Sequence, residues 1–144
     1  MRNALVGALG LLIGACGDGR TPLELGKSVS GTLTKDDSCW TSCNSPPPGQ
    51  TPTCNGGCSD KYQVDVTAGT SYTVTFSSST RAEVQFEDLE NGHITDKSGG
   101  GGSTVGASHT PATWVPKKSG INRVGVYALT DYLPASYTLT VTKK

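Results

Sequence analysis

The sequence contains few charged residues and no excess of either sign. Charged side chains make up 17% of its 144 residues, with 12 basic and 12 acidic, whereas an ordinary globular domain has about 25%. A protein that binds a row of phosphates needs clustered Lys and Arg. Basic residues here form nothing longer than a pair, such as Lys143 and Lys144 at the end of the chain. We therefore expect no nucleic acid among the partners.

Residues suited to catalysis are also scarce. The only histidines are His93, which follows an Asn-Gly turn, and His109. A triad assembled from Ser108, His109 and Asp96 would lack the strand-to-helix elbow and the oxyanion hole that such chemistry needs. No pair of carboxylates is placed by the sequence at the ends of adjacent strands. We expect neither an enzyme active site nor a cofactor, and a small hydrolase or enzyme inhibitor is a distant alternative.

No apolar run is long enough to cross a membrane. The longest, residues 4–15, follows the single positive charge of Arg2. About twelve residues of helix span roughly 18 Å, against the ~30 Å of a bilayer core. This length is typical of the apolar region of a signal peptide, and the scattered glycines and alanines argue against a buried core helix. We expect residues 1–15 to be removed.

The end of this run, Leu12-Ile13-Gly14-Ala15-Cys16, resembles the lipobox of bacterial lipoproteins. The resemblance implies diacylglyceryl transfer to the Cys16 sulfur, cleavage before Cys16 and acylation (palmitate) of the new amine. Two or more acyl chains, at ~0.8 kcal/mol per buried methylene, give a durable membrane anchor. An Asp directly after the cysteine would resemble an inner-membrane retention signal. Gly17 stands at that position instead, which favours an anchor in the outer membrane. The domain would then face the periplasm or the cell surface.

The mature chain would be a short tether followed by one domain. Residues 16–22 are the lipidated terminus and tether, and six extended residues reach only about 20 Å. Residues 23–144 suffice for one domain with a core. Arg2 is the only charged residue removed with the signal, which leaves 11 basic against 12 acidic side chains and a formal charge of −1.

Alternation of apolar and polar residues predicts several half-buried strands. No segment has a sustained helical period, and Gly (19 residues), Ser and Thr are abundant. Further strands are expected near 28–34 and 112–115. The inward-facing rows are Tyr62, Val64 and Val66; Tyr72, Val74 and Phe76; Ala82, Val84 and Phe86; Val124, Val126 and Ala128; and Tyr137, Leu139 and Val141.

Short strands that are apolar on one face require two sheets packed face to face. We predict an all-β protein, a small antiparallel β-sandwich of about seven or eight strands, jelly-roll-like, with a disulfide-stapled insert. A barrel is the alternative. Residues 97–110, which contain four consecutive glycines, are expected to form a flexible loop, because the Gly-Lys-Ser/Thr of a phosphate-binding loop is absent.

Four cysteines form the insert, residues 38–59, in the spacing C-x3-C-x10-C-x3-C. An even number in an exported chain indicates two disulfides. Three pairings are possible. Because the spacing is symmetric about a proline-rich centre, we favour a nested pairing, Cys43 with Cys54 and Cys39 with Cys58. The alternative is a tetrahedral zinc site, which an oxidising compartment disfavours.

The insert is the expected contact surface for a partner. Its candidate contact residues are Trp40 and the tip, Pro46, Pro47 and Pro48. Each disulfide would contribute about 2–3 kcal/mol on the chain-entropy model. A stapled loop that only resists proteolysis is an equally open interpretation.

The order of motifs resembles the bacterial pre-peptidase C-terminal domain, a β-sandwich of secreted proteins. The matching stretches, within residues 23–142, are LGKSVSGTL (25–33), DKYQVDV (60–66), AGTSYTV (68–74), DLENG (88–92), KSG (118–120) leading to VGV (124–126), and YTLTV (137–141). Asn122 departs from the family, which usually has an aromatic residue there, and the cysteine insert is a second departure.

The resemblance implies a non-catalytic domain that in some relatives binds protein fibres or polysaccharide. Some relatives bind calcium through acidic loops, and Glu87, Asp88 and Glu90 would be the candidates here. Their spacing fits no calcium loop, so we expect a solvated strand end and no metal.

These observations predict a lipid-anchored, non-catalytic binding or accessory domain of the bacterial cell envelope. The expected partners are the membrane, through Cys16, and an envelope protein or polysaccharide. The alternative is a structural subunit of an envelope or secretion assembly.

Overall fold

The computed structural model describes residues 19–86, 92–95, 101–102 and 104–144. The signal segment and Cys16, the acidic residues Glu87, Asp88 and Glu90, and Asp96 lie outside these residues. The described chain contains no helix that is both long and apolar enough to cross a membrane.

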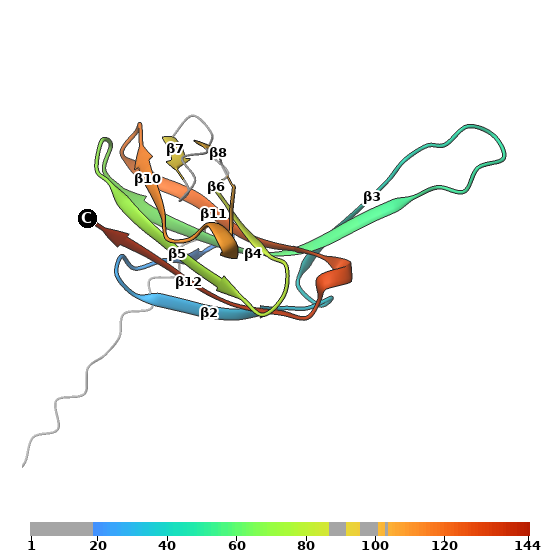
Figure 1. The fold of residues 1–144 in the computed structure, drawn as a ribbon, viewed down its shortest axis with the longest axis horizontal. Coiled ribbons are helices and arrows are strands. Elements are labelled where there is room, and N and C mark those ends of the chain that lie inside the picture. Colours follow the sequence, from blue (N-terminus) through green and yellow to red (C-terminus); the bar gives the residue numbers. More distant parts are fainter. Residues whose placement is uncertain (1–18, 87–91, 96–100, 103) are drawn as a thin grey trace, which may run out of the picture.

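The described residues form two β-sheets that pack face to face as a sandwich, so the predicted fold class is confirmed (Figure 1). They contain twelve strands and two short 3-10 turns, η2 (Ala107–His109) and η3 (Thr130–Tyr132). Every strand pair is antiparallel except β1 with β4.

The first sheet has the order β1-β4-β11-β6-β9, and β3 pairs with β4 at the same edge as β1. Its strands are β1 (Thr21–Pro22), β3 (Ser38–Cys43), β4 (Cys54–Val66), β6 (Glu83–Phe86), β9 (Thr104–Gly106) and β11 (Gly120–Leu129). Thr21 and Pro22 were expected in the tether. They instead pair in parallel with Tyr62 and Gln63, so the tether is shorter than predicted.

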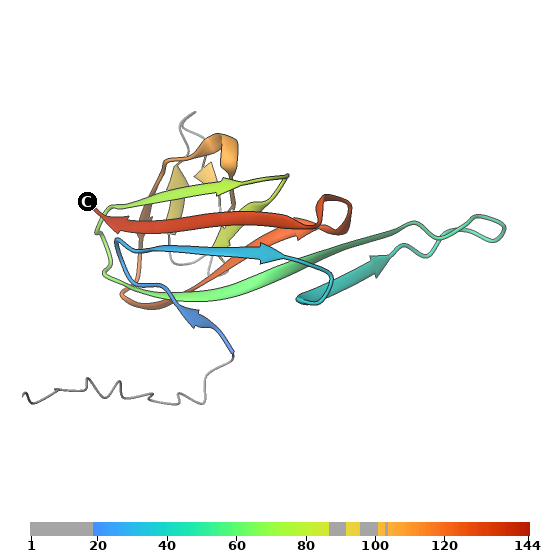
Figure 2. The ribbon, with the colours of Figure 1, turned by 90° about the horizontal axis from the view of Figure 1, so that it is seen from below.

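The second sheet has the order β2-β12-β5-β10-β7-β8. Its strands are β2 (Ser28–Leu33), β5 (Tyr72–Ser78), β7 (Gly92–Thr95), β8 (Gly101–Gly102), β10 (Ala112–Pro116) and β12 (Ala135–Lys143). Figure 2 shows β2, β12 and β5 running side by side, with β4 in the layer beyond them.

The core lies between the sheets and contains all five predicted inward rows, each of whose residues is buried. Trp114 is at its centre, with its ring centroid 4.3 Å from that of Phe86 and 5.6 Å from that of Tyr72. At ~25 cal/mol per Å² of apolar surface, this burial is the main stabilising contribution to the fold.

The prediction of a flexible loop over residues 97–110 is wrong for the part that the structure describes. Thr104–Gly106 pairs with β6, Gly101–Gly102 pairs with β7, and Val105 is fully buried in the core. One apolar residue among glycines gives no alternating pattern that would predict a strand. The burial of the Val105 side chain and the backbone hydrogen bonds to neighbouring strands order the segment.

The cysteine insert is a β-hairpin that continues β4 beyond the sandwich. We call residues 38–59 the arm. It projects away from the two sheets in both ribbon views (Figures 1 and 2). Cys39 is bonded to Cys58 and Cys43 to Cys54, so the nested pairing is confirmed. Because all four sulfurs are in disulfides, the zinc alternative is wrong.

Candidate functional site

A groove of about 440 Å³ lies where the arm joins the sandwich, on the outer face of the first sheet. β3, β4, β6, β11 and η3 all contribute to its walls. Its lining residues are Trp40, Gly57, Arg81, Ala82, Glu83, Gln85, Tyr127, Ala128, Leu129 and Tyr132. Large apolar side chains, some of them exposed, with a few charged and amide groups at the rim are the usual composition of a ligand site.

Trp40 packs on the outer face of the sheet at this groove. It is the cross-strand neighbour of Gly57, and a Cβ placed on Gly57 would lie 3.4 Å from both Cζ2 and Nε1 of the indole. The indole therefore covers the glycine, yet 47% of the Trp40 surface remains exposed. The exposed part of Trp40 is open to a ligand.

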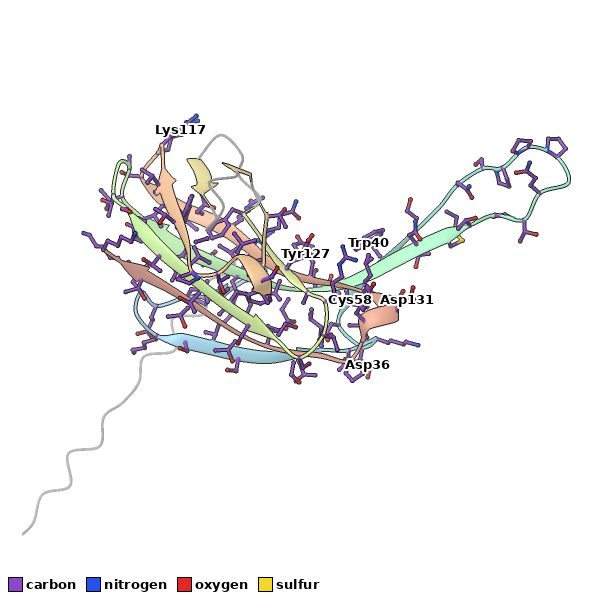
Figure 3. The ribbon with its side chains drawn as sticks, viewed as in Figure 1. Asp36, Trp40, Cys58, Lys117, Tyr127 and Asp131 are labelled. Atoms are coloured by element: carbon purple, nitrogen blue, oxygen red, sulfur yellow. A yellow bond between two sulfur atoms is a disulfide. The ribbon has the colours of Figure 1, made fainter. Side chains whose placement is uncertain are left out.

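Tyr127 is held in the same manner on the neighbouring strand. It lies two residues after Gly125 on β11, so both face the same side of the sheet. A Cβ on Gly125 would overlap the Tyr127 ring, and only glycine leaves room for the ring to lie along the strand. Figure 3 shows Trp40 and Tyr127 together at the junction of the arm and the sandwich.

Charged and amide groups border the aromatic side chains. The Arg81 guanidinium lies 5.8 Å from the ring centroid of Tyr132, a cation–π distance. Glu83 is the cross-strand neighbour of Tyr127, and Gln85 follows it on the same face of β6. The rim thus supplies hydrogen-bond donors from Arg81 and Gln85 and acceptors from Glu83 and Gln85.

A shallower depression lies on the outer face of the second sheet, where only Ser, Thr, Gly and Tyr line it. Several of its hydroxyls are paired across β2 and β12: Ser30 contacts Thr138 at 2.9 Å, and Thr32 contacts Ser136 at 3.0 Å. The buried Ser78 hydroxyl has no hydrogen-bond partner among the described residues. Hydroxyls that already bond to one another give a ligand less to bind, so the groove is the better candidate site.

A buried hydrogen-bonded chain connects the two sheets beneath these surfaces. Tyr137 on β12 donates to the carboxylate of Asp60 on β4. Each phenol has one proton, so Tyr62 donates to the Tyr137 oxygen. Gly31 on β2 leaves room for the Tyr137 hydroxyl, because a Cβ there would overlap it.

Burial and these partners alter the acidity of both phenols. Burial raises the pKa of Tyr137, and its hydrogen bonds with Asp60 and Tyr62 raise it further. Burial also raises the pKa of Tyr62; the hydrogen bond with Tyr137 lowers it, and the negative charge of Asp60 raises it. Tyr62 and Tyr137 are buried in the core, Asp60 is half-buried, and none of the three lines the groove, so we assign them a structural role.

The structure separates the contact residues expected from the sequence. Trp40 lies in the groove at the base of the arm, whereas Pro46, Pro47 and Pro48 lie at its tip, where the last two are exposed. Tyr127, Tyr132 and Arg81 were not identified from the sequence. One signal was available, because Gly125 and Tyr127 stand two apart on the outward row of a predicted strand, the pattern of a ring covering a glycine.

The described residues contain no cluster of three or more His, Cys, Asp or Glu that could hold a metal ion. Ser108 lies exposed in η2, and neither histidine side chain is among those described. Comparisons with protein-family models, curated proteins and solved structures find no match to this chain.

Proposed function

We propose that this protein is a non-catalytic, carbohydrate-binding module of the bacterial cell envelope, held at the membrane by a lipid on Cys16. The observation that carries the proposal is the pair of aromatic rings, Trp40 and Tyr127, that lie along the outer sheet face inside a groove with a polar rim.

Aromatic rings held in this orientation suit a sugar ring. The C–H face of a pyranose is apolar and packs against the face of an indole or phenol, which removes apolar surface from water on both sides. Because the two rings already pack against Gly57 and Gly125 before a ligand arrives, less side-chain entropy is lost on binding than for free side chains.

The rim supplies what the edge of a sugar requires. Hydroxyls around a pyranose must keep hydrogen-bond partners when they leave water. Arg81, Glu83 and Gln85 offer donors and acceptors beside the aromatic side chains. A protein ligand is the alternative, since Trp, Tyr and Arg are also enriched at protein interfaces. Aromatic rings beside both donors and acceptors suit the apolar face and the hydroxyl edge of one sugar ring together, and we favour carbohydrate for that reason.

The sequence supports the location of this activity. Leu12 to Cys16 has the pattern of a lipobox, and the motif order over residues 23–142 resembles an exported β-sandwich domain that in some relatives binds polysaccharide. With the chain paired to the sandwich from Thr21 onward, four residues would separate Cys16 from β1. They reach about 17 Å at most between Cα atoms, which keeps the sandwich close to the envelope surface.

Sedimentation of the full, oxidised chain with insoluble peptidoglycan, chitin and cellulose tests the proposal, followed by titration with soluble fragments of whichever polymer binds. Trp40→Ala and Tyr127→Ala should each weaken binding at least tenfold, while the fold is retained because Trp40 is half exposed. Ile121→Ala is the matched control, since Ile121 is 64% exposed but does not line the groove. The proposal fails if no polysaccharide binds, or if both groove variants bind as the control does.

A further inference from the structure

The arm carries an unusual combination of features for an exposed hairpin. No charged residue occurs from Ser38 to Ser59, and no residue of β3 is buried. Two disulfides hold its strands together, and the arm projects beyond the sandwich (Figure 1). Its outer strand, β3, has β4 as its only partner strand among the described residues.

The disulfides reveal which backbone groups of β3 are unpaired. The two bonded cysteine pairs are cross-strand neighbours with Cα–Cα distances of 4.0 Å, which identifies them as non-hydrogen-bonded pairs of the antiparallel ladder. Trp40 and Ser42 therefore bond to β4. Cys39, Thr41 and Cys43 direct their N–H and C=O groups to the open side, where no described residue bonds to them.

Natural edge strands are usually protected from pairing by a lysine, a proline, a bulge or a covering segment. β3 has none of these from Ser38 to Cys43. An isolated hairpin is unstable in water, because ordering it costs conformational entropy. The two disulfides already hold β3 in place, so a strand that pairs with it does not bear this cost.

We propose that two copies of the chain pair through β3, antiparallel and about a two-fold axis at Thr41. This register places Cys39 of each copy opposite Cys43 of the other and Thr41 opposite Thr41. The three outward-facing residues of one copy then meet the three of the other, which makes roughly six backbone hydrogen bonds. The interface is self-complementary, as two-fold symmetry requires.

The occupant is a second copy because of this symmetry and the absence of charge. Two identical arms approach without like-charge repulsion, since the arm has no charged side chain to oppose itself. The arm also projects clear of the sandwich (Figure 2), so in this register the tip of each arm lies beside the base of the other arm, with Asn44 of one copy opposite Ser38 of the other.

Pairing would place both grooves on one face. The two-fold axis is perpendicular to the four-stranded ribbon, and Trp40 of each copy therefore stands on the same side. If the proposed carbohydrate function holds, a repetitive polymer would be bound at two points, with the gain in avidity that linked sites give. The pairing itself does not depend on that function.

Sedimentation velocity of the full, oxidised chain in density-matched detergent tests the pairing. Thr41→Pro removes an outward N–H from each copy while the bonds to β4 remain, so the dissociation constant of the dimer should rise roughly thirty-fold for two lost hydrogen bonds. Thr41→Val keeps the N–H and is the matched control, which should dimerise as the wild type does.

A charge exchange tests the register. Thr41→Lys and Thr41→Glu each place like charges opposite one another and should be monomers, whereas an equimolar mixture should form a mixed dimer. A wild-type chain that stays monomeric at about 100 µM, or a dimer that all Thr41 variants leave unchanged, overturns the proposal. So does a photo-crosslinker at position 41 that captures only a different envelope protein. Polysaccharide binding is also measured on monomeric Thr41→Pro. This measurement tests the carbohydrate proposal independently of the dimer.

Discussion

Removal of one hydroxyl, in Tyr137→Phe, should measurably weaken the connection between the two sheets. The substitution keeps the ring in the core and deletes the donor to Asp60 and the acceptor for Tyr62. A hydrogen bond to a charged acceptor contributes about 1.5–3 kcal/mol, and a buried hydroxyl left without its partner adds to the cost. We expect a loss of about 2–3 kcal/mol at pH 7, which corresponds to roughly 10 °C in melting temperature for a domain of this size.

The same hydroxyl should determine part of the response to alkaline pH. Burial raises the pKa of Tyr137 and Tyr62 above the ordinary tyrosine value of about 10. Above pH 10 the unfolded chain releases these protons while the folded chain retains them. The stabilisation is therefore complete below pH 10 and is lost as the pH rises further, by at most about 1.4 kcal/mol per pH unit for each phenol.

Urea unfolding followed by tryptophan fluorescence at pH 7, 9, 10 and 11 measures both effects. Tyr137→Phe should be less stable at pH 7 and should lose stability less steeply between pH 10 and 11 than the wild type. Half-buried Tyr132 lies outside the hydrogen-bonded chain, so Tyr132→Phe is the control and should follow the wild type. Equal stability at pH 7 together with equal slopes above pH 10 would refute the hydrogen-bonded chain.

Three further predictions concern single positions. Gly125→Ala should displace the Tyr127 ring and weaken polysaccharide binding about as much as Tyr127→Ala; normal binding would show that the ring orientation is unimportant. Asn122→Val should stabilise the fold by about 1–3 kcal/mol in urea unfolding, because the buried Asn122 amide has no hydrogen-bond partner among the described residues; a loss of stability would indicate a partner. Cys16→Ala should leave an unprocessed chain without lipid label, and normal processing and labelling of that variant would exclude the anchor.

The sandwich could be predicted because apolar and polar residues alternate along its strands, which is the pattern of half-buried β-strands. Tyr72, Val74 and Phe76 face the core, and the intervening Thr73 and Thr75 face outward. The nested disulfides could also be predicted, because a symmetric spacing about a proline-rich turn puts Cys39 opposite Cys58 once the chain reverses. Both inferences use contacts that are local in sequence or repeat along it.

Order in the glycine-rich segment could not be predicted, because it depends on neighbours distant in the sequence. Val105 is buried only because β9 pairs with β6 across the first sheet. The arm was likewise expected only as a disulfide-stapled insert folded back on itself, whereas Cys54–Val66 is one continuous strand. Nothing in the polar residues of its outer half distinguishes an extended hairpin from a loop.

By itself, the sequence determined the strand periodicity, the buried rows, the disulfide pairing and the lipobox pattern on which the anchor proposal depends. Each of these is set by side chains within a short stretch or by a covalent constraint. Only the tertiary structure decided that Trp40, Tyr127 and Arg81 border one groove and that β3 ends a sheet with an open edge. Those features arise from the order of the strands in a sheet. That order is determined by long-range backbone pairing, and few individual side chains specify it.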